Sequence, residues 1–127
     1  MKKFILTVLC GLLLISPLMA QNLTLKKKEA KTVTFTIKDE DGDVVDVSLT
    51  TMTFVMKENM DGDALITKND SDFNKVQASV GIVYFVLDSS DTNRVGNFMG
   101  ELKIVFSTSN IDKSGIIDIK IIKSLTD

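Results

Sequence analysis

The chain has 127 residues, with 15 lysines and arginines against 17 acidic residues, one Cys, one Pro and no Trp or His. A chain of this length holds one domain. Without His there is no imidazole base, no catalytic triad of the Ser–His type and no His-ligated metal. The slightly acidic balance disfavours nucleic acid as a partner, because phosphate binding needs a basic stripe.

Residues 1–20 have the layout of a secretory signal peptide, and we call them the leader. Two lysines precede an apolar run over 4–15, and Pro17 comes shortly before the small residue Ala20. We expect cleavage after Ala20, although Leu18 is larger than is usual at the −3 position. The alternatives are an uncleaved membrane anchor and a buried helix, but the run is short for a bilayer span, which needs about 20 apolar residues.

Cleavage would remove the only Cys, Cys10, so the exported domain would depend on its apolar core without disulfides. We expect a secreted or periplasmic protein with no membrane association after cleavage, and incorporation into a virion is a further possibility. Residues 21–31 are expected to form a flexible lead-in to a domain over 32–127. The lead-in holds a basic cluster, interpreted as solvated, with weak contact to an anionic surface as the alternative: Lys26, Lys27, Lys28 and Lys31.

Apolar and polar residues alternate through the rest of the chain, which is typical of antiparallel sheets with one face in the core. We therefore predict an all-β fold, an Ig-like antiparallel β-sandwich of about seven or eight strands. In the segment 82–87 the residues on both faces of a strand would be apolar, so we expect a central strand there. Residues 115–123 are expected to form a strand that pairs inside a sheet or, alternatively, lies at an open edge. The expected strands are 32–38, 44–49, 51–57, 64–68, 75–80, 82–88, 97–106 and 115–123.

Acidic residues gather around two Asp-Gly pairs. The clusters are Asp39, Asp41, Asp43 and Asp46, followed by Asp61 and Asp63. Asp and Gly are the ordinary residues of tight turns, and we interpret both clusters as turns. A loop-bound Ca²⁺ is the alternative, because carboxylates at alternate positions can share a hard cation, although the spacing is not that of an EF-hand loop.

An enzymatic role is disfavoured by the remaining side chains. Serines in turn-like contexts have no base except Lys to activate them: Ser89, Ser90, Ser107 and Ser109. Gly96 and Gly100 do not form a phosphate loop and are expected to mark bulges, and Arg94 is expected to be a surface charge. We therefore assign no catalytic, cofactor-binding or metal-binding residue and no cofactor.

Several short segments occur in a characteristic order. Residues 35–49 lead a strand into an Asp-Gly turn and an apolar-Asp-apolar stretch, and a further strand covers 53–57. Residues 81–87, Asp91-Thr92 and 96–101 follow, the last reading Gly-Asn-Phe-Met-Gly-Glu. This series resembles the Ig-like N-terminal domain of phage baseplate upper proteins over roughly residues 32–106. The resemblance implies a sandwich used for docking between proteins, with no catalysis and no required cofactor.

The residues of these segments are also expected to specify the fold. Asp91 and Thr92 are expected to tie a corner by side chain to backbone hydrogen bonds. Aromatic residues are expected to fill the space between the sheets: Phe35, Phe54, Tyr84, Phe98 and Phe106. For function, we expect a structural or docking module for protein–protein assembly or attachment, with a protein partner or a homo-oligomer. The alternative is a secreted bacterial Ig-like envelope or adhesion protein that binds a protein or a glycan.

Overall fold

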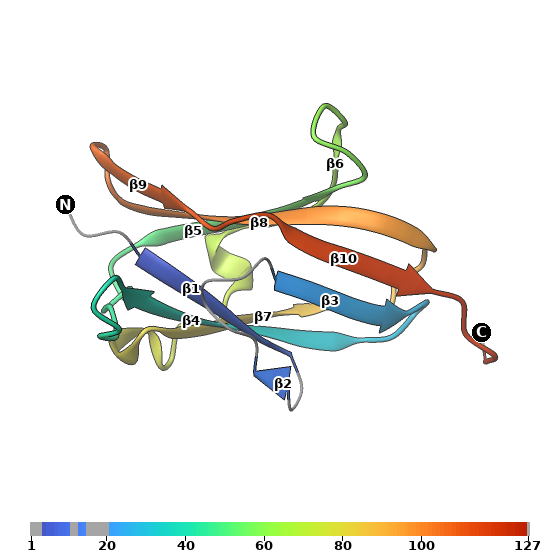
Figure 1. Ribbon diagram of the computed structural model, residues 1–127, viewed down its shortest axis with the longest axis horizontal. Coiled ribbons are helices and arrows are strands. Elements are labelled where there is room, and N and C mark those ends of the chain that lie inside the picture. Colours follow the sequence, from blue (N-terminus) through green and yellow to red (C-terminus); the bar gives the residue numbers. More distant parts are fainter. Residues whose placement is uncertain (1–3, 11–12, 15–20, 127) are drawn as a thin grey trace.

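The computed structural model describes residues 4–10, 13–14 and 21–126. These residues form two β-sheets packed face to face, as Figure 1 shows. The prediction of an all-β sandwich is therefore confirmed. Among the described residues, no helix has the length and apolar character that crossing a membrane requires.

One sheet, sheet A, has the strand order β2-β1-β4-β7. Its strands are β1 (Phe4–Cys10), β2 (Leu13–Leu14), β4 (Lys31–Asp39) and β7 (Ile82–Leu87). The other, sheet B, has the order β3-β10-β8-β5-β6, with β9 paired to β8. Its strands are β3 (Gln21–Lys26), β5 (Thr51–Lys57), β6 (Ala64–Lys68), β8 (Gly96–Ser107), β9 (Asn110–Lys113) and β10 (Ile117–Ile122). Strand β3 runs parallel to β10, which in turn pairs antiparallel with β8.

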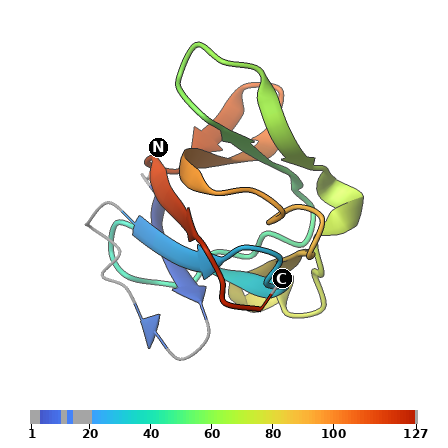
Figure 2. The same cartoon turned by 90° about the vertical axis from the view of Figure 1, so that its right-hand side faces the viewer.

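The core lies between the two sheets, which Figure 2 shows end-on. Alternate residues of β4 and β10 point inward, because successive side chains of a strand face opposite sides. Four phenylalanines form its centre. The ring centroids of Phe54 and Phe85 are 4.8 Å apart, and Phe73 meets Phe85 edge to face at 5.3 Å. Phe35 packs on the same ring at 5.8 Å.

Six of the expected strands are present, with small shifts at their ends. They are β4, β5, β6, β7, β8 and β10. The strand expected over 44–49 is wrong: Val44 makes one bridge to Lys38, and Val47 is buried in a loop where its amide donates to the carbonyl oxygen of Ala78 at 3.0 Å. The strand expected over 75–80 is also wrong, because this segment ends in a 3-10 turn, η2 (Ala78–Val80). In each segment one buried apolar residue, Val47 or Ala78, produced a sequence pattern that resembled the alternation of a strand.

Strand β7 is not the central strand that its sequence predicted. It ends the order of sheet A, and on its outer face Tyr84 is 37% and Val86 is 46% exposed. Tyr84 therefore does not fill the space between the sheets. Phe73 and Phe85 take part in the core instead, and Phe106 is only partly buried against it.

The segment 21–31 differs from the flexible lead-in that was expected. Its first part is β3, which places Leu23 and Leu25 in the core. The pairing of β3 with β10 also decides between the two expectations for 115–123. Strand β10 has a neighbour on each side, so the open-edge alternative is wrong.

The described parts of the leader are β1, an extended strand that pairs antiparallel with β4, and β2, which pairs with β1. The buried-helix alternative is therefore wrong for Phe4–Cys10. The expected cleavage site, with Leu18 and Ala20, lies outside the described residues.

Candidate docking surface

The outer face of sheet A carries an uncharged patch, built by β4 and β7. Thr32 lies opposite Val86, Thr34 opposite Tyr84, and Thr36 opposite Ile82. We call these six residues the threonine–tyrosine face. A sheet face of this composition matches the centre of protein–protein interfaces, which are depleted in charge and enriched in aromatic residues.

The outer face of sheet B differs sharply in charge. The inward positions of its strands are apolar, and the outward positions carry basic and acidic side chains. Those charged residues are Lys26, Lys57, Glu101, Lys103, Asp118 and Lys120. Charged, strongly hydrated faces are typical of surface left in water, so the two faces of the sandwich are chemically distinct.

A shallow groove of about 200 Å³ opens on the outer side of sheet B. Val55, Met60, Met99 and Ile116 provide its apolar lining, with Lys57, Asn59, Gly100 and Glu101 around them. This volume is below the roughly 300–1,000 Å³ of ordinary small-molecule sites. The groove is therefore a minor feature of a mostly charged face.

The first acidic cluster forms a turn after β4, as predicted. Gly42 has φ 85°, and its amide donates to the carbonyl oxygen of Asp39 at 3.0 Å. Asp39 is buried, and its Oδ1 accepts hydrogen bonds from the amides of Asp41 at 2.9 Å and Asp43 at 3.1 Å. The carboxylates of Asp39, Asp41 and Asp43 have oxygens within 4.8 Å of one another. The hydrogen bonds of Asp39 explain the cluster as turn chemistry.

Asp46 and the second cluster lie apart from this carboxylate group. Oδ1 of Asp46 accepts the amide of Ser48 at 2.9 Å, and hydrogen bonding to Ser48 lowers the pKa of Asp46. Asp61 and Asp63 flank Gly62 in the turn that joins β5 to β6. Both Asp-Gly pairs therefore stand at the turns that the sequence predicted.

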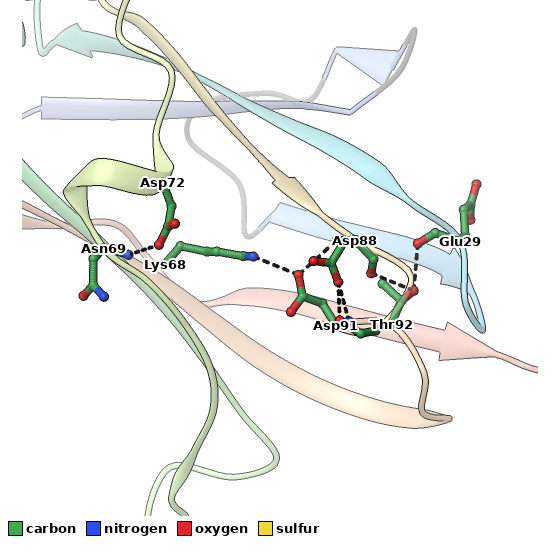
Figure 3. Close-up of polar contacts among 8 residues, drawn as sticks. Glu29, Lys68, Asn69, Asp72, Asp88, Asp91 and Thr92 are labelled. Carbon is green, nitrogen blue, oxygen red and sulfur yellow. Dashed lines mark hydrogen bonds and ion pairs between the residues drawn. The ribbon is translucent and has the colours of Figure 1, made fainter.

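The corner after β7 is held by Asp91 and Thr92, which the sequence singled out, together with Asp88 and Lys68 (Figure 3). Asp88 Oδ1 accepts from the amide of Asp91 at 2.9 Å, and Asp91 Oδ2 accepts from the amide of Asp88 at 2.9 Å. Lys68 Nζ lies 2.8 Å from the same oxygen of Asp91 and ties this corner to β6. Thr92 is fully buried and donates to the carbonyl oxygen of Glu29 at 2.7 Å. The predicted corner ties are confirmed.

A second charged tie lies beside β5. Lys75 Nζ is 2.9 Å from Oδ1 of Asp70 and also donates to the carbonyl oxygen of Thr50. The same Asp70 oxygen accepts the amide of Met52 at 2.9 Å. Burial works to raise the pKa of Asp70, but the hydrogen bonds from Lys75 and Met52 outweigh it and lower this pKa. The sequence pattern did not predict this contact, because Asp70 was expected in a loop and Lys75 at the start of a strand.

The side chains considered for catalysis have local roles. Ser90 Oγ donates to Asp88 at 2.6 Å, and the hydroxyl oxygens of Ser107 and Ser109 lie 3.5 Å apart in an exposed turn. Arg94 is only partly exposed, and among the described residues its Nε finds no hydrogen-bond partner. Gly100 lies in the regular part of β8 and not at a bulge: a Cβ there would stand 2.6 Å from the ring of Phe54.

The comparisons with known proteins add no relative. No protein-family model and no curated protein matches the chain. The surfaces described above are therefore the basis for assigning a function.

Proposed function

We propose that this protein is a non-enzymatic docking module that binds a protein partner through the threonine–tyrosine face. The observation that supports this is the contrast between the two outer faces of one sandwich. Charge is concentrated on sheet B, whereas the six residues of the threonine–tyrosine face are uncharged and Lys38 stands at the next outward position of β4. Burying these six residues desolvates no ionised group, and the threonine and tyrosine hydroxyls would need hydrogen-bond partners on the bound protein.

We further propose that the protein is exported and that the leader is removed after Ala20. The sequence supports this through its basic start, its apolar run and the small residue at the cleavage point. The partner would then be met outside the cytoplasm. The resemblance to phage baseplate domains favours a structural partner in an assembly, and an envelope or adhesion protein is the second candidate.

Photo-crosslinking tests the binding face. A photoreactive phenylalanine analogue replaces Tyr84 in one variant and Ile122 in the control. The control is well matched, since Tyr84 is 37% and Ile122 is 36% exposed, and they lie on opposite outer faces. In the native host we expect adducts with another protein at position 84 and far fewer at position 122. Equal yields at the two positions, or none at either, would refute the docking face.

Mass spectrometry of N-terminal peptides tests export. Cells are separated into cytoplasm, envelope and medium, and any phage particles are purified. We expect a peptide that starts at Gln21 in the envelope or the medium. Its enrichment in particles would favour the phage assembly, and its absence there would favour the envelope protein. A protein that begins at Met1 in every fraction would contradict export with removal of the leader.

A further inference from the structure

The edge of β4 is occupied by the leader in the full chain. Strand β1 pairs antiparallel with β4 over seven positions, from Phe4 opposite Asp39 to Cys10 opposite Val33. On its other side β4 pairs with β7. Removal of the leader would therefore leave β4 as the last strand of sheet A. An unpaired strand edge is a template for pairing with another chain.

The backbone of β4 is suited to such pairing. The amide of Ile37 donates to the carbonyl oxygen of Gly81 at 2.8 Å, and its carbonyl oxygen accepts from Val45 at 3.1 Å. Both groups thus point away from the β1 side. Backbone groups alternate sides along a strand, so Thr34 and Thr36 direct their N–H and C=O groups toward β1. The edge is a regular row of donors and acceptors without a Pro.

The sequence of β4 has a near two-fold pattern centred on Phe35. Val33 and Ile37 stand two positions on either side, and both are buried. Reversing the strand also sets Lys31 against Asp39 at its ends. Two copies of β4 in antiparallel register about Phe35 would therefore match apolar with apolar residues and basic with acidic ones.

We propose that the processed protein forms a two-fold symmetric dimer through the β4 edges, with Thr34 of one copy opposite Thr36 of the other. The occupant of the edge is a second copy of this chain, in the place that β1 holds in the full chain. The two A sheets become one continuous sheet, and the two threonine–tyrosine faces become one surface. This inference rests on the proposed leader removal and deepens the docking role.

Disulfide trapping tests the register. The full chain is expressed with its leader in a secreting host, and the processed product is purified. Thr34→Cys and Thr36→Cys are made separately; Cys10 is lost with the leader, so each product has one thiol. In the proposed dimer, positions 34 and 36 of the two copies form a hydrogen-bonded antiparallel pair. The Cα atoms of such a pair are about 5.5 Å apart, within the range that a disulfide can span. Oxidation of the mixed variants should give several-fold more covalent dimer than oxidation of either alone.

A proline variant tests the edge itself. Thr34→Pro removes one N–H that faces the edge and none that pairs with β7, and edge strands tolerate Pro at such positions. We expect a folded monomer by light scattering, whereas the control Thr34→Val should stay dimeric because it keeps the N–H. Circular dichroism checks the fold of both. If the proline variant does not fold, the disulfide-trapping experiment alone tests whether the dimer forms through the β4 edges.

Three results would overturn the dimer. They are a processed protein that stays monomeric at all concentrations tested, a product that retains Met1, and trapping that is no better in the mixed sample than in the single variants. These failures are separable from failure of the docking role. A monomer that still crosslinks to another protein at position 84 removes only the dimer, and a dimer without such adducts removes only the docking face.

Discussion

The hydroxyl of Thr92 donates a hydrogen bond to the carbonyl oxygen of Glu29 at 2.7 Å, across 63 positions of the sequence. The bond is reinforced in the opposite direction, since the amide of Lys28 donates to the carbonyl oxygen of Thr92 at 3.0 Å. Together these bonds join the corner after β7 to the turn between β3 and β4, where Lys28 has φ 66°. They fix the point at which the chain passes from sheet B to sheet A.

Removing this hydroxyl should weaken the fold. Thr92→Val keeps the shape of the side chain but leaves the carbonyl oxygen of Glu29 without its buried donor, which should cost about 1–3 kcal/mol of unfolding free energy. Thr92→Ser keeps the donor and should cost less. Urea unfolding of the three proteins measures the difference. A Val variant as stable as the parent, with a loss only in the Ser variant, would mean that the methyl group, and not the hydrogen bond, matters at this position.

Gly100 should be intolerant of even one added carbon. A Cβ would lie 2.6 Å from Phe54 and 3.0 Å from Ile119, at the centre of the core. We expect Gly100→Ala to destabilise the protein by about 1–3 kcal/mol through overpacking. Gly115→Ala is the control, because a Cβ there meets nothing within 4 Å. Thermal unfolding should separate the two variants, and adding Phe54→Leu should recover part of the loss.

The charged corner predicts a specific response to acid. The hydroxyl of Ser90 and the amide of Asp91 lower the pKa of Asp88 in the folded protein. A carboxyl with a lowered folded pKa stabilises the fold above its ordinary pKa of about 3.9, and this contribution is lost as the pH falls through the lowered value. Stability should therefore drop below about pH 4.

Asp88→Asn should reduce this acid sensitivity, while Asp118→Asn on the outer face of sheet B should keep it. Urea midpoints measured between pH 7 and pH 2 would give, for each variant, the slope of stability against pH. An unchanged slope in Asp88→Asn would show that other carboxylates control the acid response. Asp70 is the next carboxylate to examine, since its pKa is lowered by Lys75 and Met52 against the opposing effect of burial.

The acidic turn predicts a difference between two substitutions of Asp39. Asp39→Asn keeps an oxygen that can accept the amides of Asp41 and Asp43, whereas Asp39→Ala leaves both amides without it. We expect the Ala variant to lose about 1–3 kcal/mol more than the Asn variant. Chemical unfolding measures this directly. A similar loss in both variants, together with stabilisation of the parent but of neither variant by added Ca²⁺, would instead favour the metal interpretation.

Alternation along the chain was sufficient to predict most of the sandwich. The inward residues of β4, β5 and β10 are the apolar ones, so their period of two followed directly from burial. The same logic misled at Ile82–Leu87. Val86 and Tyr84 are apolar or aromatic but exposed, so hydrophobicity marked a surface and not a second core face.

Position in the sheet was harder to predict than strand identity. Residues 21–26 looked like a polar tail, because Asn22, Thr24 and the lysines hid the alternation of Leu23 and Leu25. Their strand exists through its pairing with β10, a contact between distant segments that no local pattern contains. The threonine–tyrosine face was equally invisible in the sequence, since it arises only when β4 and β7 are placed side by side.

The pairing of β3 with β10 sets the order in which the molecule can be completed. Gln21 stands opposite Ile117, so the start of the proposed mature chain is joined to its last strand. Contacts between such distant segments form late, because the intervening chain must first be brought together. In the export proposed above, sheet B could not close until β10 had emerged from the secretion channel. Under that proposal the topology keeps the chain in a form that can still be threaded until translocation is nearly finished.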